Sequence, residues 1–311
     1  MAWAEELERI REALEEASAV LRRFTPGDVE ARRKQGDDPV TEADTAVDTL
    51  LRRLLPRDGE GWLSEETEDD LSRLEKSRVW VVDPLDGTRE FVEGIPEWSV
   101  SVALVIDGEP MAGGICNPAT GETIVGARGM GVTLNGRPTR VSGRPGLRGA
   151  TVVASRSEVK RKEWEGYQDD LFTIRPTGSV AYKLGLVAAG MVDATWTLTP
   201  KHEWDVAAGV ALVLAAGGSI VTASPDEARF NRRKPKLSRL LAAPPQLVPE
   251  IEEEIARRAA ALEREALIEA YLLGRIPRET LLRELGPEQL DEIEYQRDAL
   301  RRDAERALKG A

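Results

Sequence analysis

The amino-acid sequence predicts an α/β fold with an α+β N-terminal half, an α/β C-terminal half and a C-terminal helical extension. Two amphipathic helices come first, and short apolar runs separated by turn residues follow from residue 61, which is the pattern of antiparallel hairpins. Strand-like and helix-like segments alternate from about residue 148, as in layers joined by crossover connections. Only helical periodicity remains from residue 246 onward. We therefore expect three parts, at residues 1–147, 148–245 and 246–311.

The first part begins with two predicted helices. Apolar residues at three- and four-residue spacing predict one helix over residues 3–24 and another over about 41–55, separated by a basic loop at 31–39. Their apolar positions are Leu7, Ile10, Leu14, Ala17 and Leu21 in the first helix, and Val47, Leu50, Leu51 and Leu54 in the second. The expected strands are GWLSEE, RVWVVD, WSVSVALVID, PMAGGICNP, ETIVGA and GVTLNG.

The second and third parts have different patterns. In the second, the strands ATVVAS, LFTIR, VDATWTL, SIVTA and SRLLAAPP are interspersed with the helices SEVKRKEWEGY, SVAYKLGLVAAG and WDVAAGVALVLAAGG. The third is expected to hold one long helix, a short helix after Pro277, and a helix after Gly286-Pro287 that carries Leu290, Ile293, Leu300 and Leu308. Its 16 acidic and 11 basic residues exclude a single-sign tail. Three alternatives are open for this extension: packing on its own subunit, a dimerisation element, or a disordered tail.

Composition excludes several classes of protein. Of the 311 residues, 41% are hydrophobic and 32% charged, which suits a buried core under a solvated surface. The net charge of −12 argues against a nucleic-acid polymer or an anionic membrane as partner. The longest apolar stretch, 206–221, is too short to cross a membrane, and the N-terminus has no signal-peptide pattern, so we expect a cytoplasmic protein. One cysteine and one histidine leave the chemistry to carboxylates, hydroxyls and the backbone.

The segment VWVVDPLDGTREF, residues 79–91, is the most informative. A buried strand is expected to end in two aspartates three residues apart, so that both carboxylates and the carbonyl between them converge on one point. A Gly-Thr pair then opens a helix, and its first amides can seat a phosphate oxygen. The residues concerned are Asp83, Pro84, Leu85, Asp86, Gly87 and Thr88. The alternative is an ordinary Asp-Gly turn.

Other acidic residues occur at strand ends and helix starts. Glu65 and Glu66 follow a short apolar strand, DPVTEAD (38–44) opens the second helix, and Glu203-Trp204-Asp205 opens the small-residue helix. Each group alone is typical of solvated surface or of a helix cap. Together they supply the oxygen ligands that a hard divalent cation prefers, Mg²⁺ first.

Four motifs carry a resemblance to a known family. With DPVTEAD, SEET, DPLDGT and EWDVAAG in this order and spacing, residues 5–245 resemble the inositol monophosphatase-like superfamily of metal-dependent, often lithium-sensitive phosphatases. The resemblance implies the layered α/β/α/β/α sandwich of the inositol monophosphatase and fructose-1,6-bisphosphatase type. In that fold the N-terminal half supplies most metal ligands and the C-terminal half completes the substrate pocket.

The resemblance also implies roles for individual residues. Glu65, Asp83 and the Leu85 carbonyl would hold one Mg²⁺, and Asp83, Asp86 and Asp205 a second. Thr88, hydrogen-bonded to Asp44, would orient the attacking water together with Glu65. Asp44 is also a candidate ligand of a third, weakly bound ion. The implied substrate-binding residues are Gly87, Thr88, Arg89, Gly178, Ser179, Lys183 and Asp205.

Within the superfamily, Arg89-Glu90-Phe91 is similar to bacterial 3′(2′),5′-bisphosphate nucleotidases, and Leu198 stands where inositol monophosphatases usually carry a glutamate. This implies removal of the 3′-phosphate from adenosine 3′,5′-bisphosphate. The spacing from Ser179 to Lys183 is one residue longer than in some nucleotidases. The alternatives are an inositol-1-phosphate or other sugar monophosphatase, a fructose-1,6-bisphosphatase, and a non-enzymatic scaffold on the same fold.

Four further features have simple interpretations. GARGMG (126–131) precedes a strand, so it is expected to be a β-turn and not a phosphate loop. Cys116 is expected in the core, and His202 near the mouth of the pocket in a structural or substrate-contacting role. The basic residues within 229–236 are either a solvated face or an attraction for a doubly phosphorylated substrate. The expected partner is a small phosphorylated molecule, with a homodimer as one outcome for the extension.

Overall fold

The computed structural model describes residues 3–29, 32–33, 39–167 and 170–309. Two compact units make up the chain, Met1–Glu250 and Ile251–Ala311, and each is described by itself. Asp38 and most of the predicted basic loop lie outside the described residues. The predicted division of the first 245 residues into two halves stays a prediction.

The first unit begins with α1 (Ala4–Leu21) and, after the short pair β1 (Arg32–Arg33) and β2 (Pro39–Val40), α2 (Glu42–Leu54). All five apolar positions predicted for α1 are buried, which confirms its periodicity. Thr41 caps α2: its hydroxyl accepts a hydrogen bond from the Ala43 N–H at 3.2 Å, and its own N–H donates to the Asp44 carboxylate at 2.8 Å. Such a reciprocal cap satisfies amide groups that have no partner inside the helix.

A seven-stranded sheet follows. Its strands run in chain order across the sheet, with β3 parallel to β4 and each later pair antiparallel, as the hairpin pattern predicts. GARGMG forms the turn between β7 and β8, as expected. The strands are β3 (Gly61–Ser64), β4 (Arg78–Asp86), β5 (Ser99–Ile106), β6 (Glu109–Asn117), β7 (Glu122–Ala127), β8 (Gly131–Leu134) and β9 (Arg137–Thr139).

The rest of this unit contains smaller sheets and their helices. Strand β10 (Ala150–Ser155) is parallel to β11 (Phe172–Thr177), while β12 (Thr195–Trp196), β16 (Leu240–Ala243) and β14 (Ser219–Thr222) form an antiparallel set. The connecting helices are α4 (Arg156–Lys160), α5 (Val180–Ala188) and α6 (Glu203–Ala215), and α3 (Thr88–Val92) follows β4. A short ladder, β13 (Lys201–His202) with β15 (Lys236–Leu237), and the 3-10 helices η1 (Ser72–Glu75), η2 (Pro225–Ala228) and η3 (Pro245–Leu247) complete it.

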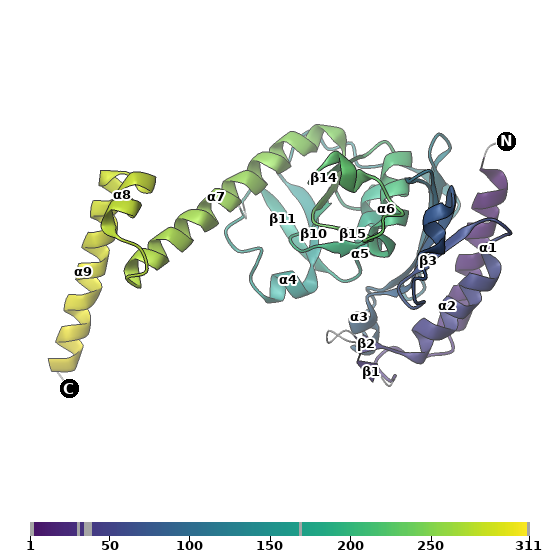
Figure 1. Ribbon diagram of the computed structural model, residues 1–311, viewed down its shortest axis with the longest axis horizontal. Coiled ribbons are helices and arrows are strands. Elements are labelled where there is room, and N and C mark those ends of the chain that lie inside the picture. Colours follow the sequence, from purple (N-terminus) through teal and green to yellow (C-terminus); the bar gives the residue numbers. More distant parts are fainter. Residues whose placement is uncertain (1–2, 30–31, 34–38, 168–169, 310–311) are drawn as a thin grey trace. The chain divides into compact units, whose positions relative to one another are not determined.

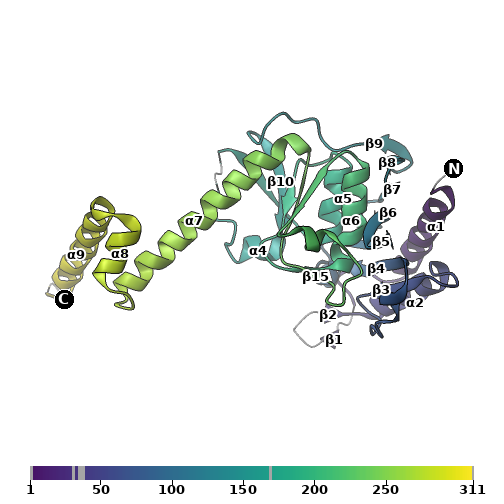
Figure 2. The same ribbon diagram turned by 45° about the horizontal axis from the view of Figure 1, so that its top comes forward.

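These elements are stacked in layers (Figures 1 and 2). Helices α1 and α2 pack against the seven-stranded sheet, α6 packs on strands of the same sheet, and α5 packs between α6 and the smaller sheets. Helix α4 packs on β10 and β11. The predicted layered α/β architecture is confirmed.

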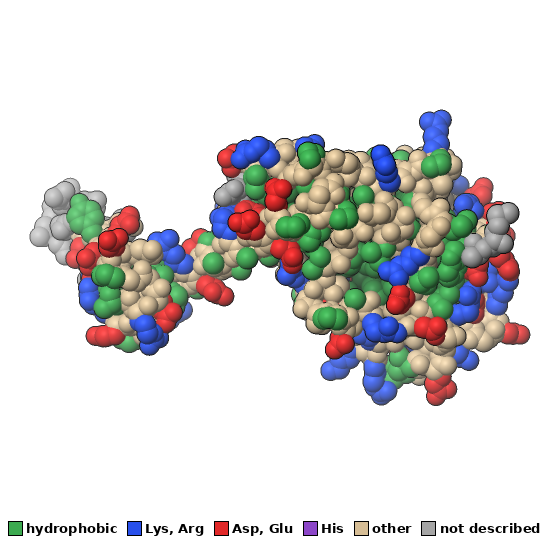
Figure 3. All heavy atoms as spheres, turned by 90° about the horizontal axis from the view of Figure 1, so that it is seen from above, with side chains coloured by type: hydrophobic (Ala, Val, Ile, Leu, Met, Phe, Trp, Pro, Cys, Tyr) green, Lys and Arg blue, Asp and Glu red, His purple; other side chains and the backbone are tan. Residues whose placement is uncertain are grey.

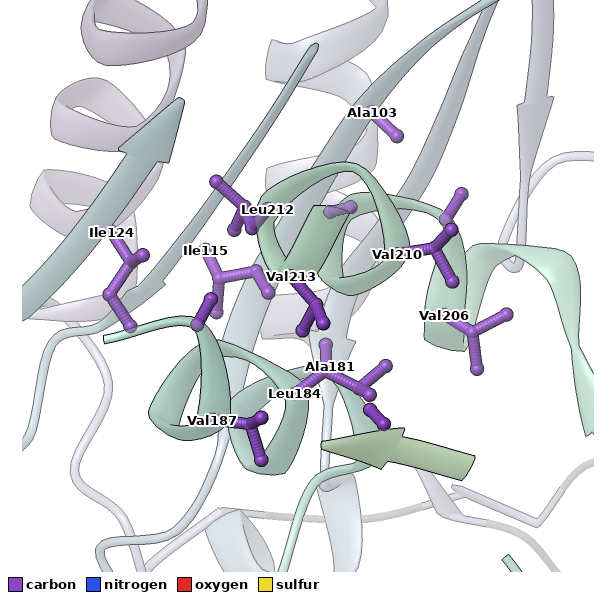
Figure 4. Close-up of a cluster of buried hydrophobic side chains, with 14 of the residues drawn as sticks. Ala103, Ile115, Ile124, Ala181, Leu184, Val187, Val206, Val210, Leu212 and Val213 are labelled. Atoms are coloured by element: carbon purple, nitrogen blue, oxygen red, sulfur yellow. The ribbon is translucent and has the colours of Figure 1, made fainter. Parts of the chain in front are cut away.

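The core between α5, α6 and the large sheet is built of aliphatic side chains (Figure 4). Ala181, Leu184 and Val187 of α5 lie beside residues of α6 and of β5, β6 and β7. The two helices approach closely at Gly209, where an added Cβ would lie 2.3 Å from the Leu184 Cβ. The close approach brings the N-termini of α5 and α6 to the same end of the layer, where β4 also ends.

The second unit is helical, as predicted. Helix α7 (Val248–Leu272) starts at the end of the first unit, and α8 (Arg278–Leu285) and α9 (Pro287–Lys309) follow Pro277 and Gly286. Leu281, Leu290 and Ile293 form its small core, packed against Leu267, Ile268 and Tyr271. The side chains of Leu300 and Leu308 lie outside the described residues.

The surface carries charges of both signs. On the face shown in Figure 3, Lys and Arg side chains alternate with Asp and Glu among uncharged groups. Among the described residues, no helix is long and apolar enough to cross a membrane.

Candidate active site

The end of β4 positions the first group of acidic residues. The strand continues through Pro84 to Asp86 instead of ending at Asp83, and its register against β5 shifts between the two aspartates. Within the shifted segment, Asp83 Oδ1 accepts the Leu85 N–H at 3.0 Å. Gly87 then takes a φ of 93°, a conformation that glycine adopts without strain, and α3 starts at Thr88.

Helix α5 holds the second carboxylate. Asp86 Oδ2 accepts the Ser179 hydroxyl at 2.7 Å and the Ala181 N–H at 2.5 Å. Ser179, whose φ is 54°, also accepts the Tyr182 N–H at 2.9 Å and so caps α5. A carboxylate at a helix N-terminus satisfies amides that have no partner inside the helix. These bonds join the end of β4 to the start of α5.

Helix α6 brings the third aspartate. Asp205 lies in its first turn, and Asp205 Oδ2 accepts the His202 N–H at 2.8 Å. Asp83, Asp86 and Asp205 therefore each have one carboxylate oxygen that accepts a hydrogen bond from the protein. Among the described residues, the structure gives no hydrogen bond to the second carboxylate oxygen of these three side chains. In each of them, that oxygen can therefore bind a ligand.

A cavity of about 420 Å³ contains these groups. Eleven of its lining residues are among those that the sequence analysis assigns to metal or substrate binding. They are Glu65, Asp83, Leu85, Asp86, Gly87, Thr88, Arg89, Gly178, Ser179, Lys183 and Asp205. Asp44 does not line the cavity. It reaches the cavity through Thr88, whose Oγ1 lies 3.0 Å from Asp44 Oδ1 and 2.9 Å from the Leu85 carbonyl oxygen.

The environment of the buried aspartates in the cavity disfavours their ionised form. Burial raises the pKa of Asp83 well above its usual range, and the charges of Glu65, Asp86 and Asp205 raise it further. Burial, then Asp86 and Glu65, raise the pKa of Asp205 in the same way. Burial also raises the pKa of Asp86, although its bonds to Ser179 and Ala181 oppose that shift. Because like charges in a buried site repel, these carboxylates ionise fully only beside a cation.

The donor set fits Mg²⁺. Carboxylate oxygens and a backbone carbonyl are hard ligands, and the site contains no thiolate. In the described part of the chain, no three Asp, Glu, His or Cys side chains already form a complete metal-binding group. A bound cation would therefore draw the carboxylates closer together as it neutralises them.

Lysine side chains also line the cavity, and the sequence did not point to all of their partners. Lys183 is buried, with Nζ 3.4 Å from the Thr177 carbonyl oxygen. Burial lowers the pKa of Lys183, while the charge of Asp86 opposes that shift. Lys201 Nζ donates to Thr199 Oγ1 at 2.6 Å and lies 3.6 Å from buried Glu158 Oε1. Sequence analysis missed Glu158, because nothing in its charged segment shows that this glutamate is buried.

Several other predicted neighbours lie elsewhere. Leu198 is half-buried but does not line the cavity. Trp196, which lies close to Glu203-Trp204-Asp205 in the sequence, packs in an aromatic cluster with Trp164, 4.8 Å between ring centroids, and does not line the cavity. His202 and Trp204 do line the cavity, with their rings stacked 4.4 Å apart. Cys116 is buried in the core, as expected.

Comparisons with known proteins agree with this geometry. The model of the inositol monophosphatase family matches residues 3–264. An inositol-1-monophosphatase of Rhizobium meliloti is 36% identical over 190 residues, 58% of this chain and 71% of the relative. The Nus factor SuhB of Escherichia coli is 32% identical over 224 residues, 68% and 82% of the two chains. The solved structure of the Thermotoga maritima IMPase has a TM-score of 0.69 at 26% identity, covering 83% of this chain and 99% of that one. The motifs, the layered fold and these matches agree, and the chain belongs to the inositol monophosphatase family.

Proposed function

We propose that this chain is a Mg²⁺-dependent phosphomonoesterase whose catalytic centre is the cavity at the ends of β4, α5 and α6. The family it belongs to is a family of phosphatases that are generally metal-dependent. The observation that carries the proposal is the meeting of buried, mutually repelling carboxylates with Lys183 and Lys201 in one cavity. Such a cavity can take both metal ions and an anionic substrate.

Glu65, Asp83, the Leu85 carbonyl, Asp86 and Asp205 are the residues that would hold Mg²⁺. When bound, the ions supply positive charge to the phosphate and lower the pKa of bound water. Thr88 acts from the protein side. Its one hydroxyl proton is directed at Asp44 or at the Leu85 carbonyl, so its oxygen lone pairs remain to accept a hydrogen bond from water. Thr88 and Glu65 together would orient the attacking water.

For the substrate we propose adenosine 3′,5′-bisphosphate ahead of inositol 1-phosphate. The supporting observation is that Arg89, Lys183 and Lys201 line the same cavity, where they can match a second phosphate. Leu198 gives no support, because it does not line the cavity. Inositol 1-phosphate is the second candidate, and it is favoured by the name of the Rhizobium meliloti relative.

Steady-state kinetics with Mg²⁺ test the proposal. We expect hydrolysis of adenosine 3′,5′-bisphosphate with a higher kcat/KM than that of inositol 1-phosphate or fructose 1,6-bisphosphate. Asp83→Asn should abolish turnover of all three, because it removes a proposed ligand of both ions, and Li⁺ should inhibit the parent enzyme. A better rate with inositol 1-phosphate would reject the nucleotidase assignment alone. Phosphate release from none of the three would reject these substrates and leave the non-enzymatic scaffold.

A further inference from the structure

A second cavity, of about 530 Å³, lies beside the candidate active site and shares a wall with it. Glu65, His202, Trp204 and Lys236 line both cavities. The rings of His202 and Trp204 are 7° from parallel, so the shared wall has a flat aromatic part. The volume is in the range of small-molecule sites.

The second cavity combines apolar and cationic side chains. Leu63, Trp204 and Pro235 are its apolar residues, and Arg233, Lys234 and Lys236 are exposed cations at its edge. Within the described residues, these three cations form no ion pair. Two acidic residues, Glu65 and Asp69, also line the cavity, and Arg73 lies 2.8 Å from Asp69, so the three cations outnumber the acidic residues there. In a chain of net charge −12, this concentration of unmatched positive charge is a local exception.

The loop that carries these cations is held in place by buried groups. Glu203, which is fully buried, accepts the N–H groups of Asn231 at 2.7 Å and Arg232 at 3.1 Å, and its own N–H donates to the Pro235 carbonyl at 2.9 Å. Buried Arg73 donates to Asn231 Oδ1 at 2.6 Å and to the Arg232 carbonyl at 3.0 Å. The loop is therefore fixed on both sides before any ligand arrives, which lowers the entropy cost of binding.

The basic residues of 229–236 thus fall into two groups. Arg229 donates to the Asp107 carbonyl and Arg232 to the Lys236 carbonyl, so the side chains of these two arginines stabilise the conformation of the loop. Arg233, Lys234 and Lys236 have no such internal role. Arg233 and Lys234 are exposed, as the solvated-face alternative expects, and they line the second cavity and not the first.

We propose that the second cavity binds a purine nucleoside monophosphate. The base would lie on Trp204 and Pro235, and the phosphate would be held by Arg233, Lys234 and Lys236. An inorganic anion would leave the apolar residues uncovered, and a neutral aromatic molecule would leave the cations unmatched. The site shares Trp204 and Lys236 with the proposed catalytic centre, but Arg233, Lys234 and Pro235 line the second cavity alone, and the proposal does not depend on the reaction assigned to that centre.

Calorimetric titration of the full chain with adenosine 5′-monophosphate in EDTA tests the proposal. We expect the Kd for adenosine 5′-monophosphate to rise about tenfold or more in the double variant Arg233→Ala/Lys234→Ala. The control Arg137→Ala/Arg140→Ala removes two exposed cations near β9, remote from both cavities, and should leave the Kd unchanged. Ribose 5-phosphate should bind more weakly than the nucleotide, because it has the phosphate but no base. Circular dichroism and the thermal unfolding midpoint verify that each variant is folded.

Three results would overturn the proposal. The first is absence of nucleotide binding to the parent chain, or an unchanged Kd in the double variant. The second is ribose 5-phosphate binding as tightly as the nucleotide. The third is a loss of affinity in Lys183→Met but not in Arg233→Ala/Lys234→Ala, which would place the nucleotide in the catalytic cavity. Lys234→Glu alone carries the same expectation as the double variant, so the test survives if that variant does not fold.

Discussion

Thr88 is proposed to orient the attacking water without binding a metal ion. It touches Asp44 and the Leu85 carbonyl oxygen, yet it is not itself among the proposed metal ligands. Removing its hydroxyl leaves the proposed ligands in place and removes only the oxygen that accepts a hydrogen bond from the attacking water. The effect of such a change therefore belongs to the chemical step.

We expect Thr88→Val to lower kcat about 100-fold, the scale of a misplaced reactant, with the affinity for Mg²⁺ unchanged. Thr88→Ser, which keeps the hydroxyl, should recover most of the activity. Steady-state kinetics and calorimetric Mg²⁺ titration provide the two readouts. A valine variant that turns over at the parent rate, or that loses Mg²⁺, would show that Thr88 has a different role.

Cys116 is a residue whose environment makes it inert. Burial raises the pKa of its thiol from 9.0 to about 11, and Ser18 Oγ lies 3.3 Å from its sulfur. Since the folded state holds the proton more tightly than the unfolded state, this group's contribution to stability is complete below pH 9 and is lost between pH 9 and 11.

At pH 9 the native chain should therefore react with iodoacetamide much more slowly than the chain unfolded in urea. Mass spectrometry of labelled protein measures both rates, and Cys116→Ala should take up no label. Equal rates in the two states would mean that this thiol is accessible and ionised in the fold.

At the scale of elements, the start of α5 is fitted against the segment after α3. The Gly178 N–H donates to Glu97 Oε2 at 2.8 Å, and a Cβ at Gly178 would lie 2.6 Å from the Glu97 carbonyl oxygen and 2.5 Å from Glu90 Cγ. This contact places Ser179 against Asp86. The start of α5 and the end of β4 therefore meet beside Gly178, where there is no room for a side chain.

Gly178→Ala should therefore destabilise the fold by about 1–3 kcal/mol, the cost of overpacking. It should also raise KM, because Ser179 and Lys183 would move with the loop. Urea unfolding and kinetics measure the two effects. Gly143→Ala is the matched control, since an added Cβ there has no atom within 4 Å and the backbone is not left-handed. Equal stability of the two variants would contradict the fitted contact.

Most of these elements could be predicted from the sequence, because their patterns are local. Helix α1 and strand β4 follow from the spacing of apolar residues alone. Helix α4 is shorter than expected and β12 contains two residues, because charged or polar stretches there are shaped by their neighbours. The ladder of β13 with β15 has no local signal, since it depends on the loop fixed by Glu203 and Arg73.

At the scale of the whole molecule, the site is made by distant segments. The motifs pointed to Asp83, Asp86 and Asp205, and all three line one cavity. The buried pair of Glu158 with Lys201 could not be predicted, because burial of a charged residue depends on tertiary packing and not on its neighbours in sequence. All residues assigned to the site lie within the first unit, Met1–Glu250.

The second unit, Ile251–Ala311, has an apolar surface beyond its small core. Leu262, Leu273 and Tyr295 are 47%, 55% and 70% exposed. Exposed side chains of this size beside the small cluster of Leu281, Leu290 and Ile293 favour association with another chain. Of the alternatives open from the sequence, these exposures favour the dimerisation element.

We therefore expect the full chain to have the mass of a dimer in solution and Leu262→Glu/Leu273→Glu to have the mass of a single chain. Burying two carboxylates in an apolar interface is unfavourable, because they lose water without gaining a partner. Light scattering after size exclusion measures the mass, and circular dichroism verifies that the helices persist. Arg264→Glu, on the same helix, controls for added charge. A single-chain mass for the parent would reject the dimerisation element, as would an unchanged dimer in both variants. Hydrolysis by the double variant should persist, because the unit that contains the proposed catalytic centre is untouched.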